Sequence, residues 1–224
     1  MKCIRKTIWI WTILLVLAGF STEALCADDD KVWLEQEISY GISDKLSYKL
    51  AFNERFYENI TTWEEFYVDT GIDYKLTNWL VFAPRYRYIR ANFNRSNETI
   101  ENRWHMNVEL IGRFSRFTLE SRTRYEYRDF HDLPTKHRLL QRLKVVVPLP
   151  WKIEEKNIDA YLSDELNYDL DKDAATHHEM ALGVKVPFSK TFSMKFYYGH
   201  EIKKREGNWG YHTNIIGITT SHKF

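Results

Sequence analysis

Cysteine is nearly absent from this sequence. The chain has two cysteines, Cys3 and Cys26, and both lie within the first 27 residues. If that segment is removed, no disulfide can form, so an exported chain must be held together by a packed core or by a membrane. After the first 27 residues the sequence also lacks any run of the ~20 apolar residues that a spanning helix needs. A helical membrane protein is therefore excluded.

An excess of charge of either sign is also missing. The formal net charge is +1, and without the first 27 residues, which hold three basic residues and one acidic residue, it is −1. Proteins that bind nucleic acid present a strongly basic surface to the phosphate backbone. The charge balance therefore argues against nucleic acid as a partner.

The N-terminus has the organisation of an export signal. Basic Lys2, Arg5 and Lys6 precede an apolar core from Ile8 to Phe20, and small residues then lead into an acidic run. A membrane anchor would need a longer core, and the residues before Cys26 fit a lipoprotein signal poorly. We expect residues 1–27 to be cleaved, leaving a single domain at 28–224.

Aromatic residues are abundant in an otherwise polar chain. They make up 16% of the sequence, although the mean hydropathy is −0.50. A transmembrane β-barrel combines these properties, because it has an apolar lipid face, a polar lumen and aromatic girdles at both membrane interfaces.

Alternation of apolar and polar residues runs through most of the chain. In the segment from Phe66 to Leu76, the even positions are apolar or neutral, while the odd positions carry Asp69, Asp73 and Lys75. Four further segments between Leu80 and Val147 repeat the pattern, and none of the apolar faces contains a charge. Strict alternation over this length predicts strands and is incompatible with an amphipathic helix.

Eleven strands are readable, and most are long enough to cross a bilayer at a tilt. Tight turns such as Thr77–Asn78 alternate with longer polar loops such as Asn92–Asn102, although the link Pro148–Lys156 is long where a short turn is expected. Bacterial single-chain barrels have even strand numbers. We therefore predict an all-β, antiparallel transmembrane β-barrel of about 12 strands, with 10 as the fallback.

The chain ends at Phe224, in register with apolar residues at alternate positions. A terminal aromatic residue in this register is typical of bacterial outer-membrane barrels. We expect the bacterial outer membrane as the location, with its lipid and the barrel-insertion machinery as partners.

The inward-facing charges divide into two arcs. The basic arc lies on the strands between Leu80 and Val147, and its members are Arg85, Arg87, Arg103, Arg113, Arg122, Arg124, Arg128, Arg138, Arg142 and Lys144. Among the acidic residues elsewhere, we expect Glu65, Asp69, Asp73 and Glu165 to face the lumen. The arcs favour a small passive channel for anionic or oligosaccharide solutes. The alternative is a closed structural barrel, filled by Arg–carboxylate pairs, whose loops bind a partner.

Other residue clusters give weaker signals. In His177-His178-Glu179, only His177 and Glu179 share a strand face, and a metal needs three or four convergent ligands, so we predict no metal and no cofactor. An outer-membrane lipid-modifying enzyme is a further alternative, with Ser121 and His137 as its only conceivable pair; we predict no catalytic residue. Asp164 falls on the outward face, and a β-bulge at Ser163–Glu165 would explain it.

Several short motifs resemble one known family. They are Trp33–Glu37, Leu50–Phe56, Pro84–Tyr88, His137–Leu139 and Ser163–Tyr168. Together they are similar to the uncharacterised family catalogued as domain of unknown function 2490, over most of the chain after residue 27. The chain departs from the family at His177–Gly183, where relatives often carry an Asn-Arg pair. The resemblance implies a β-barrel and assigns no activity.

Overall fold

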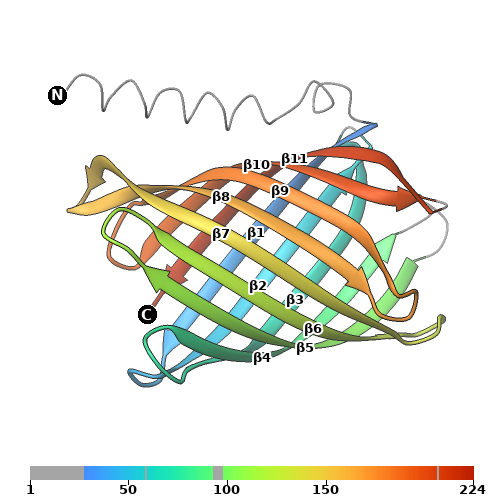
Figure 1. Ribbon diagram of the computed structural model, residues 1–224, viewed down its shortest axis with the longest axis horizontal. Coiled ribbons are helices and arrows are strands. Elements are labelled where there is room, and N and C mark those ends of the chain that lie inside the picture. Colours follow the sequence, from blue (N-terminus) through green and yellow to red (C-terminus); the bar gives the residue numbers. More distant parts are fainter. Residues whose placement is uncertain (1–27, 59, 93–97, 206) are drawn as a thin grey trace.

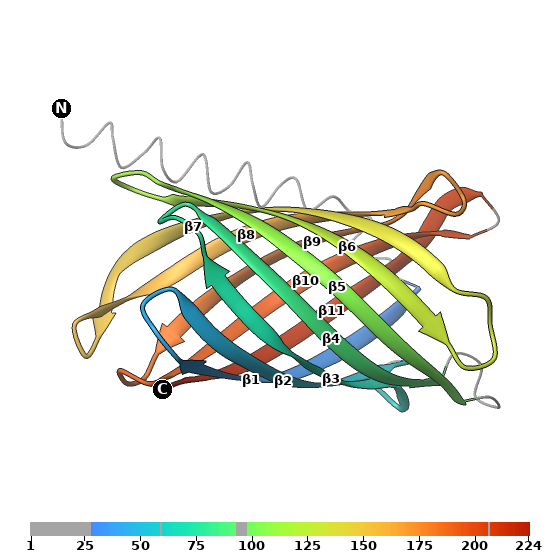
Figure 2. The same cartoon turned by 90° about the horizontal axis from the view of Figure 1, so that it is seen from below.

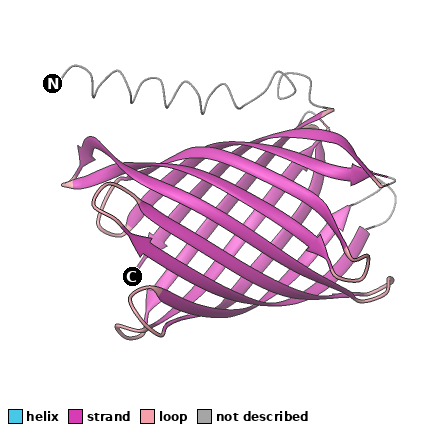
Figure 3. Ribbon diagram, in the orientation of Figure 1, coloured by secondary structure: helices cyan, strands magenta, loops and turns pink. Residues whose placement is uncertain are grey.

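The computed structural model describes residues 28–58, 60–92, 98–205 and 207–224, and these residues form one closed β-barrel (Figure 1). The strands are β1 (Asp29–Gly41), β2 (Leu46–Tyr57), β3 (Thr62–Lys75), β4 (Leu80–Asn92), β5 (Glu98–Arg113), β6 (Thr118–Phe130), β7 (Lys136–Ile153), β8 (Lys156–Asp169), β9 (Ala174–Pro187), β10 (Phe192–Arg205) and β11 (Asn208–Lys223). No helix occurs in this part of the chain (Figure 3). The expected export signal, residues 1–27, lies outside the described residues.

None of the described residues belongs to a helix that is long and apolar enough to cross a membrane.

The alternation in the sequence decides which side chains fill the barrel. Along β5, Arg103 and His105 are buried inside, whereas their neighbours Trp104 and Met106 are exposed on the outer wall. Successive side chains of a strand point to opposite faces, so one polar and one apolar series result. The predicted all-β barrel is confirmed.

Strand number and closure differ from the simplest expectation. The described residues form eleven strands, between the twelve and the ten expected. Consecutive strands pair antiparallel, but β1 and β11 pair parallel, from Asp29 opposite Thr213 to Ser39 opposite Lys223. Because the first and last strands run the same way and pair parallel, a barrel with an odd number of strands can close. The even number that we expected is therefore not required.

The parallel seam places the two ends of the barrel chain on opposite rims. We call the end where β1 begins the N-terminal rim, and the end that carries Phe224 the C-terminal rim (Figure 1). Turns 42–45, 76–79, 114–117, 154–155 and 188–191 lie at the C-terminal rim. The strands cross the barrel obliquely between the two rims (Figure 2).

Connections at the two rims are more alike in length than the sequence suggested. At the C-terminal rim, three turns are each closed by the same kind of backbone hydrogen bond, from the N–H of one residue to the carbonyl of the fourth residue after it. One example runs from Leu76 N to Leu80 O at 3.0 Å. At the N-terminal rim the predicted long loops are shorter, because β5 begins at Glu98, β9 at Ala174 and β11 at Asn208. The expected contrast between short turns and long loops was wrong, since strand pairing continues into the polar segments.

The link Pro148–Lys156 is also not a loop. β7 continues to Ile153, with a register shift between Pro148 and Lys152, and β8 begins at Lys156. Glu154 and Glu155 both have positive φ, 47° and 63°, which is the backbone of a two-residue hairpin turn. The apparent break in the turn pattern is therefore a bulged strand that ends in a tight turn.

The outer wall is apolar at mid-height and aromatic near the rims. Exposed aromatic residues near the C-terminal rim include Tyr40, Tyr74, Phe114 and Phe224, and those nearer the N-terminal rim include Trp104, Tyr125, Tyr127 and Trp209. Outward-facing charges such as Asp30, Arg90 and Glu98 lie near the N-terminal rim. A broad band of the wall between the rims is thus almost without charge.

Asp164 is the exception within that band. The register of β8 against both neighbours is regular through Asp164, which pairs with Leu143 and Met180. The bulge expected at Ser163–Glu165 was wrong, since the register shift lies between Asn167 and Tyr168. Asp164 faces outward, and its Oδ2 lies 3.0 Å from Nε2 of His178, so an imidazole partner explains the carboxylate.

Candidate functional site in the barrel lumen

The structure places the candidate lumen residues on one continuous inner surface. On β3 to β8 they occupy the strand positions that alternate with the exposed outer wall. These residues are Glu65, Asp69, Asp73, Arg85, Arg87, Arg103, Arg113, Arg122, Arg124, Arg128, Arg138, Arg142, Lys144 and Glu165. Most of them form ion pairs, either with one another or with other inward-facing residues, and the pairs differ in burial.

Asp69 holds one cluster at the boundary of the acidic and basic arcs. Its side chain is 2% exposed, and Oδ2 lies 2.7 Å from Arg87 Nε and 2.9 Å from His105 Nε2. Arg85 reaches Asp69 at 3.6 Å and also binds Asp73 at 2.6 Å. The carboxylates of β3 therefore neutralise the first arginines of the basic arc.

Aromatic rings extend this cluster into a stack. The Arg87 guanidinium lies 4.0 Å from the centroid of the Tyr67 ring, and Arg55 lies 3.8 Å from that of Trp33. Tyr67 also donates its hydroxyl hydrogen bond to Glu35 at 3.0 Å. These guanidinium groups lie over aromatic faces, and the ring electrons stabilise their positive charge inside the lumen.

Glu126 anchors a second cluster within the basic arc itself. Its side chain is completely buried and accepts from Arg138 at 2.7 Å. Arg103 and Arg124 lie 3.6 Å and 3.5 Å away. A single carboxylate thus faces three guanidinium groups, and its negative charge is what allows them to remain so close together.

Glu101 is a buried lumen residue that the sequence pattern did not single out. It lies on β5, in a segment assigned to a loop, and it accepts from Arg103 at 2.6 Å and from both Nε and Nη2 of Arg128. The signal was present, because the alternation of Arg103 and His105 continues upstream through Glu101. The arginines of the basic arc are therefore neutralised partly from within that arc.

Apart from the Arg85–Asp73 pair, these clusters lie between mid-height and the N-terminal rim, a part of the lumen that we call the ion-paired half. In the other half, the open half, the ion pairs keep contact with water. Lys144–Glu120 is 21% and 34% exposed, and Lys195–Glu37 is 26% and 39% exposed. An inward-facing side chain that stays partly exposed borders space that solvent can reach, so this part of the lumen is open to water.

Arg142 stands out between the halves. Its neighbours across the strands are Arg122 and Glu165, which bind each other at 2.5 Å. Within the described ranges, the Arg142 guanidinium forms no hydrogen bond or ion pair. A partly exposed arginine whose neighbouring carboxylate is already taken is free to bind an anion from solution.

Comparison with known proteins gives a family but no activity. Residues 30–212 match the model of the family described as protein of unknown function (DUF2490). The chain belongs to this family. The resemblance noted from the sequence motifs is thereby confirmed.

One curated relative is an uncharacterized protein of Methylorubrum extorquens, which is 25% identical over 141 residues. The match covers 62% of this chain and 61% of that protein. No solved structure matches the chain. For this DUF2490 protein, function has to be argued from the site.

In the structure of this DUF2490 protein, a third possible metal ligand lies beside His177 and Glu179. His177 faces inward beside Glu179, and Glu201 of β10 joins them, with one ligand atom of each within 4.8 Å of the others. Glu201 already binds Lys203 at 2.9 Å and His177 at 3.1 Å. These three residues could ligate a cation, but the ammonium group of Lys203 competes for the shared carboxylate.

The conceivable hydrolase pair is not brought together. Ser121 Oγ accepts from Gln141 Nε2 at 2.9 Å, while His137 Nδ1 lies 2.7 Å from the Tyr125 hydroxyl. Each side chain is thus engaged with a different partner. Nucleophile and base need to be within hydrogen-bond reach of each other, and this geometry does not supply that contact.

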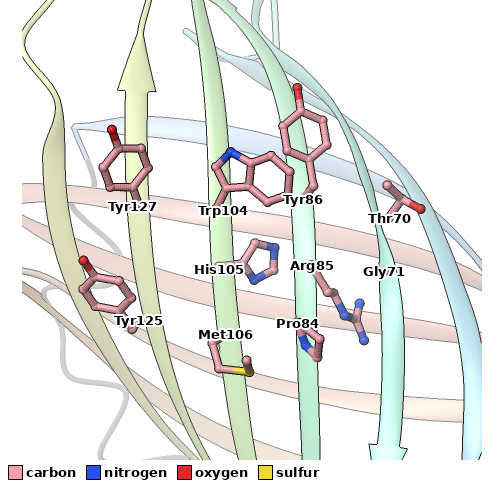
Figure 4. Close-up of a pocket in the computed structure, with 10 residues that line it drawn as sticks. All are labelled: Thr70, Gly71, Pro84, Arg85, Tyr86, Trp104, His105, Met106, Tyr125 and Tyr127. Atoms are coloured by element: carbon pink, nitrogen blue, oxygen red, sulfur yellow. The ribbon is translucent and has the colours of Figure 1, made fainter.

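A groove of about 440 Å³ lies on the outer wall across β3 to β6. Figure 4 shows the rings of Tyr86, Trp104, Tyr125 and Tyr127 on neighbouring strands of this groove. Pro84 lies at its base, where the pairing of β3 with β4 is interrupted between Gly71 and Tyr74, because proline has no N–H to donate. The surface of the groove is mainly apolar, although Arg85 and His105 of the Asp69 cluster also belong to its lining.

Proposed function

We propose that this protein is an outer-membrane β-barrel that acts as a narrow passive channel for small anionic solutes. The location is supported by the outer wall, which is apolar at mid-height and aromatic near both rims. Exposed apolar area on this scale requires a cover, and lipid covers a closed barrel on all sides. Phe224, exposed at the C-terminal rim, then acts as the recognition end for the insertion machinery.

The Arg142 guanidinium, which has no hydrogen-bond or ion-pair partner among the described residues, is the observation that carries the channel proposal. It lies where the open half meets the ion-paired half, and a solute entering from the C-terminal rim meets it before the buried clusters. Cations around it include Arg122 and Lys144, both of which are already held by carboxylates. A confined site with a free positive charge attracts anions and repels cations.

The ion-paired half forms the constriction. Glu101, Glu126 and Asp69 are each 2% exposed or less, and each binds arginines of the same or a neighbouring strand on the inner wall. Passage through this half requires hydrated ions or small solutes to slip between fixed guanidinium groups. The proposed channel is therefore of low conductance and excludes large molecules.

The membrane location is tested by placing a charge at mid-height on the outer wall. Ile216 lies near the centre of β11 and is 54% exposed. In a bilayer, Ile216→Arg is expected to lower the free energy of unfolding by about 2–4 kcal/mol, because an arginine there faces hydrocarbon. Urea titration of the protein in lipid vesicles, followed by gel mobility of unheated samples, measures this loss.

A matched substitution at the rim completes that test. Leu76 is 48% exposed and lies in the turn between β3 and β4, at the C-terminal rim. Leu76→Arg is expected to change the midpoint only slightly, since charges near the interface cost little. Equal midpoints for both variants and the parent chain would contradict a lipid-facing wall.

Channel activity is tested by current recordings in planar bilayers under a salt gradient. The parent protein is expected to give small current steps with a reversal potential that indicates anion preference. Arg142→Gln is expected to reduce the anion-to-cation permeability ratio about two- to threefold, because one free charge is removed from a narrow passage. Arg116→Gln, in the exposed turn between β5 and β6, removes the same charge outside the lumen and should leave the ratio unchanged.

A closed structural barrel is the second candidate, favoured by the complete burial of Glu126 among three arginines. Absence of current steps at any voltage, with a folded and inserted protein, would replace the channel proposal with this one. The same result with Glu126→Gln would show that the lumen stays sealed even when the central carboxylate is neutralised.

A further inference from the structure

Two tyrosines lie flat against the inner wall of the barrel. A Cβ atom on Gly183 would be 2.6 Å from Cζ of Tyr161, and one on Gly217 would be 1.9 Å from Cζ of Tyr197. Each ring therefore occupies the space above a glycine on the next strand. We call these two rings the tyrosine platform.

The platform is continuous across four strands. Tyr161 pairs with Gly183, Gly183 pairs with Tyr197, and Tyr197 pairs with Gly217, so β8, β9, β10 and β11 contribute in turn. Because both rings lean toward the higher-numbered strand, they cover one stretch of wall without a side chain between them. Two aromatic rings thus line adjacent stretches of the inner wall in an otherwise charged lumen.

The platform is partly exposed inside the lumen. Both tyrosines are only half-buried, although their side chains point inward. Nearby inward residues of β11 in the ion-paired half, Thr213 and Ile215, are fully buried. The platform thus borders the open space of the lumen rather than the packed part.

Cations on β7 lie at the platform. The Lys144 ammonium lies over the Tyr161 ring, 5.1 Å from its centroid, and is held by Glu120 at 3.1 Å. Arg142 is the next inward residue on the same strand, and its guanidinium has no partner among the described residues. The lumen therefore presents a flat apolar face next to a free, planar cation.

We propose that this surface binds a short acidic oligosaccharide, with a sugar ring on the tyrosine platform and its carboxylate on Arg142. The inference rests on the proposed channel function and names the class of solute. The C–H face of a pyranose ring is flat and apolar, so it packs on an aromatic ring, while the ring hydroxyls remain in water. A guanidinium binds a carboxylate through two parallel hydrogen bonds, which a neutral sugar does not offer.

Binding is measured by isothermal titration of the full-length barrel in detergent with three probes. Trigalacturonate has both sugar rings and carboxylates, maltotriose has only the rings, and citrate has only the carboxylates. Trigalacturonate is expected to bind at least about tenfold more tightly than either of the others. Equal affinity for citrate would reduce the surface to a plain anion site, and equal affinity for maltotriose would remove the role of Arg142; either result overturns the proposal.

Variants then locate the binding surface. Arg142→Gln and Tyr161→Leu are each expected to weaken trigalacturonate binding about tenfold. Tyr161→Phe retains the ring over Gly183 and should retain the affinity, and this variant also controls for folding. Arg116→Gln, outside the lumen, and Tyr74→Leu, on the outer wall, are the matched controls. A loss of affinity that is equal in the control variants would overturn the assignment.

This experiment separates the solute class from the channel function. An anion-selective current without trigalacturonate binding would leave the channel proposal standing and end the present one. Selective binding without any current would end the channel proposal and show that the lumen holds the sugar in a closed barrel.

Discussion

Glu126→Gln is expected to destabilise the barrel by about 3–5 kcal/mol, the largest loss among single neutralising changes in the lumen. The carboxylate is completely buried and faces Arg103, Arg124 and Arg138. With an amide in its place, three guanidinium groups remain close together without a compensating charge. The shift in the urea midpoint, read from the folded fraction in detergent or vesicles, measures the effect.

A rim glutamate provides the control for this prediction. Glu98 is also paired with an arginine, Arg90, at 2.5 Å, but both side chains are largely exposed. Solvent screens an exposed pair, so Glu98→Gln should leave the midpoint unchanged within error. If the two variants behaved alike, the buried cluster would not be a stabilising feature of the lumen.

Gly217→Ala is expected to have the second large effect. Its Cβ would lie 1.9 Å from Cζ of Tyr197, so the ring has to leave its place on the wall. Overpacking of this kind costs about 1–3 kcal/mol, so the yield of folded barrel and its urea midpoint should both fall. Gel mobility before and after heating reports the folded fraction.

A second substitution on the neighbouring strand makes the cause testable. In a Tyr197→Ala background the space above residue 217 is empty, and Gly217→Ala should then cost little. Gly210→Ala is the matched control, because no atom lies within 4 Å of its added Cβ. A loss that persists in the double variant would show that the glycine is needed for its backbone and not for the ring above it.

Much of the fold was predictable because alternation is a local property. Each strand shows which residues face inward, as Arg122 and Arg124 do on β6, without reference to any other strand. Residue type also marks the outer wall, since apolar and aromatic side chains recur on one face. The barrel and the inner position of the candidate residues follow from this pattern.

Eleven strands were readable in the sequence, but the parallel seam that lets an odd number close was not predictable in the same way. Pairing of β1 with β11 joins residues far apart in the chain, and nothing in the pattern of Asp29–Gly41 specifies the direction of its second neighbour. Strand ends were also hard to place. Glu101 and the segment around Pro148 were taken for loops because polar and proline residues resemble turns, whereas pairing with neighbouring strands keeps them extended.

Partners within the lumen depend on three-dimensional distances that the sequence does not contain. The basic and acidic arcs were visible as composition, but the sharing of Glu126 by three arginines was not. Arg142 has no ion-pair partner among the described residues because its neighbour across the strands, Glu165, binds Arg122 instead. Such choices between neighbouring charges are decided by side-chain geometry.

The parallel seam also bears on how the barrel assembles. Its residue pairs, such as Val32 with Ile216, are the most distant in sequence of any strand pair, so they form only when the whole chain is present. Until then β1 and β11 both have an unpaired edge, and open edges recruit other chains. Parallel ladders are also slightly weaker per residue than antiparallel ones. The seam is therefore the last strand pair of the barrel to form and the first place where the barrel can open.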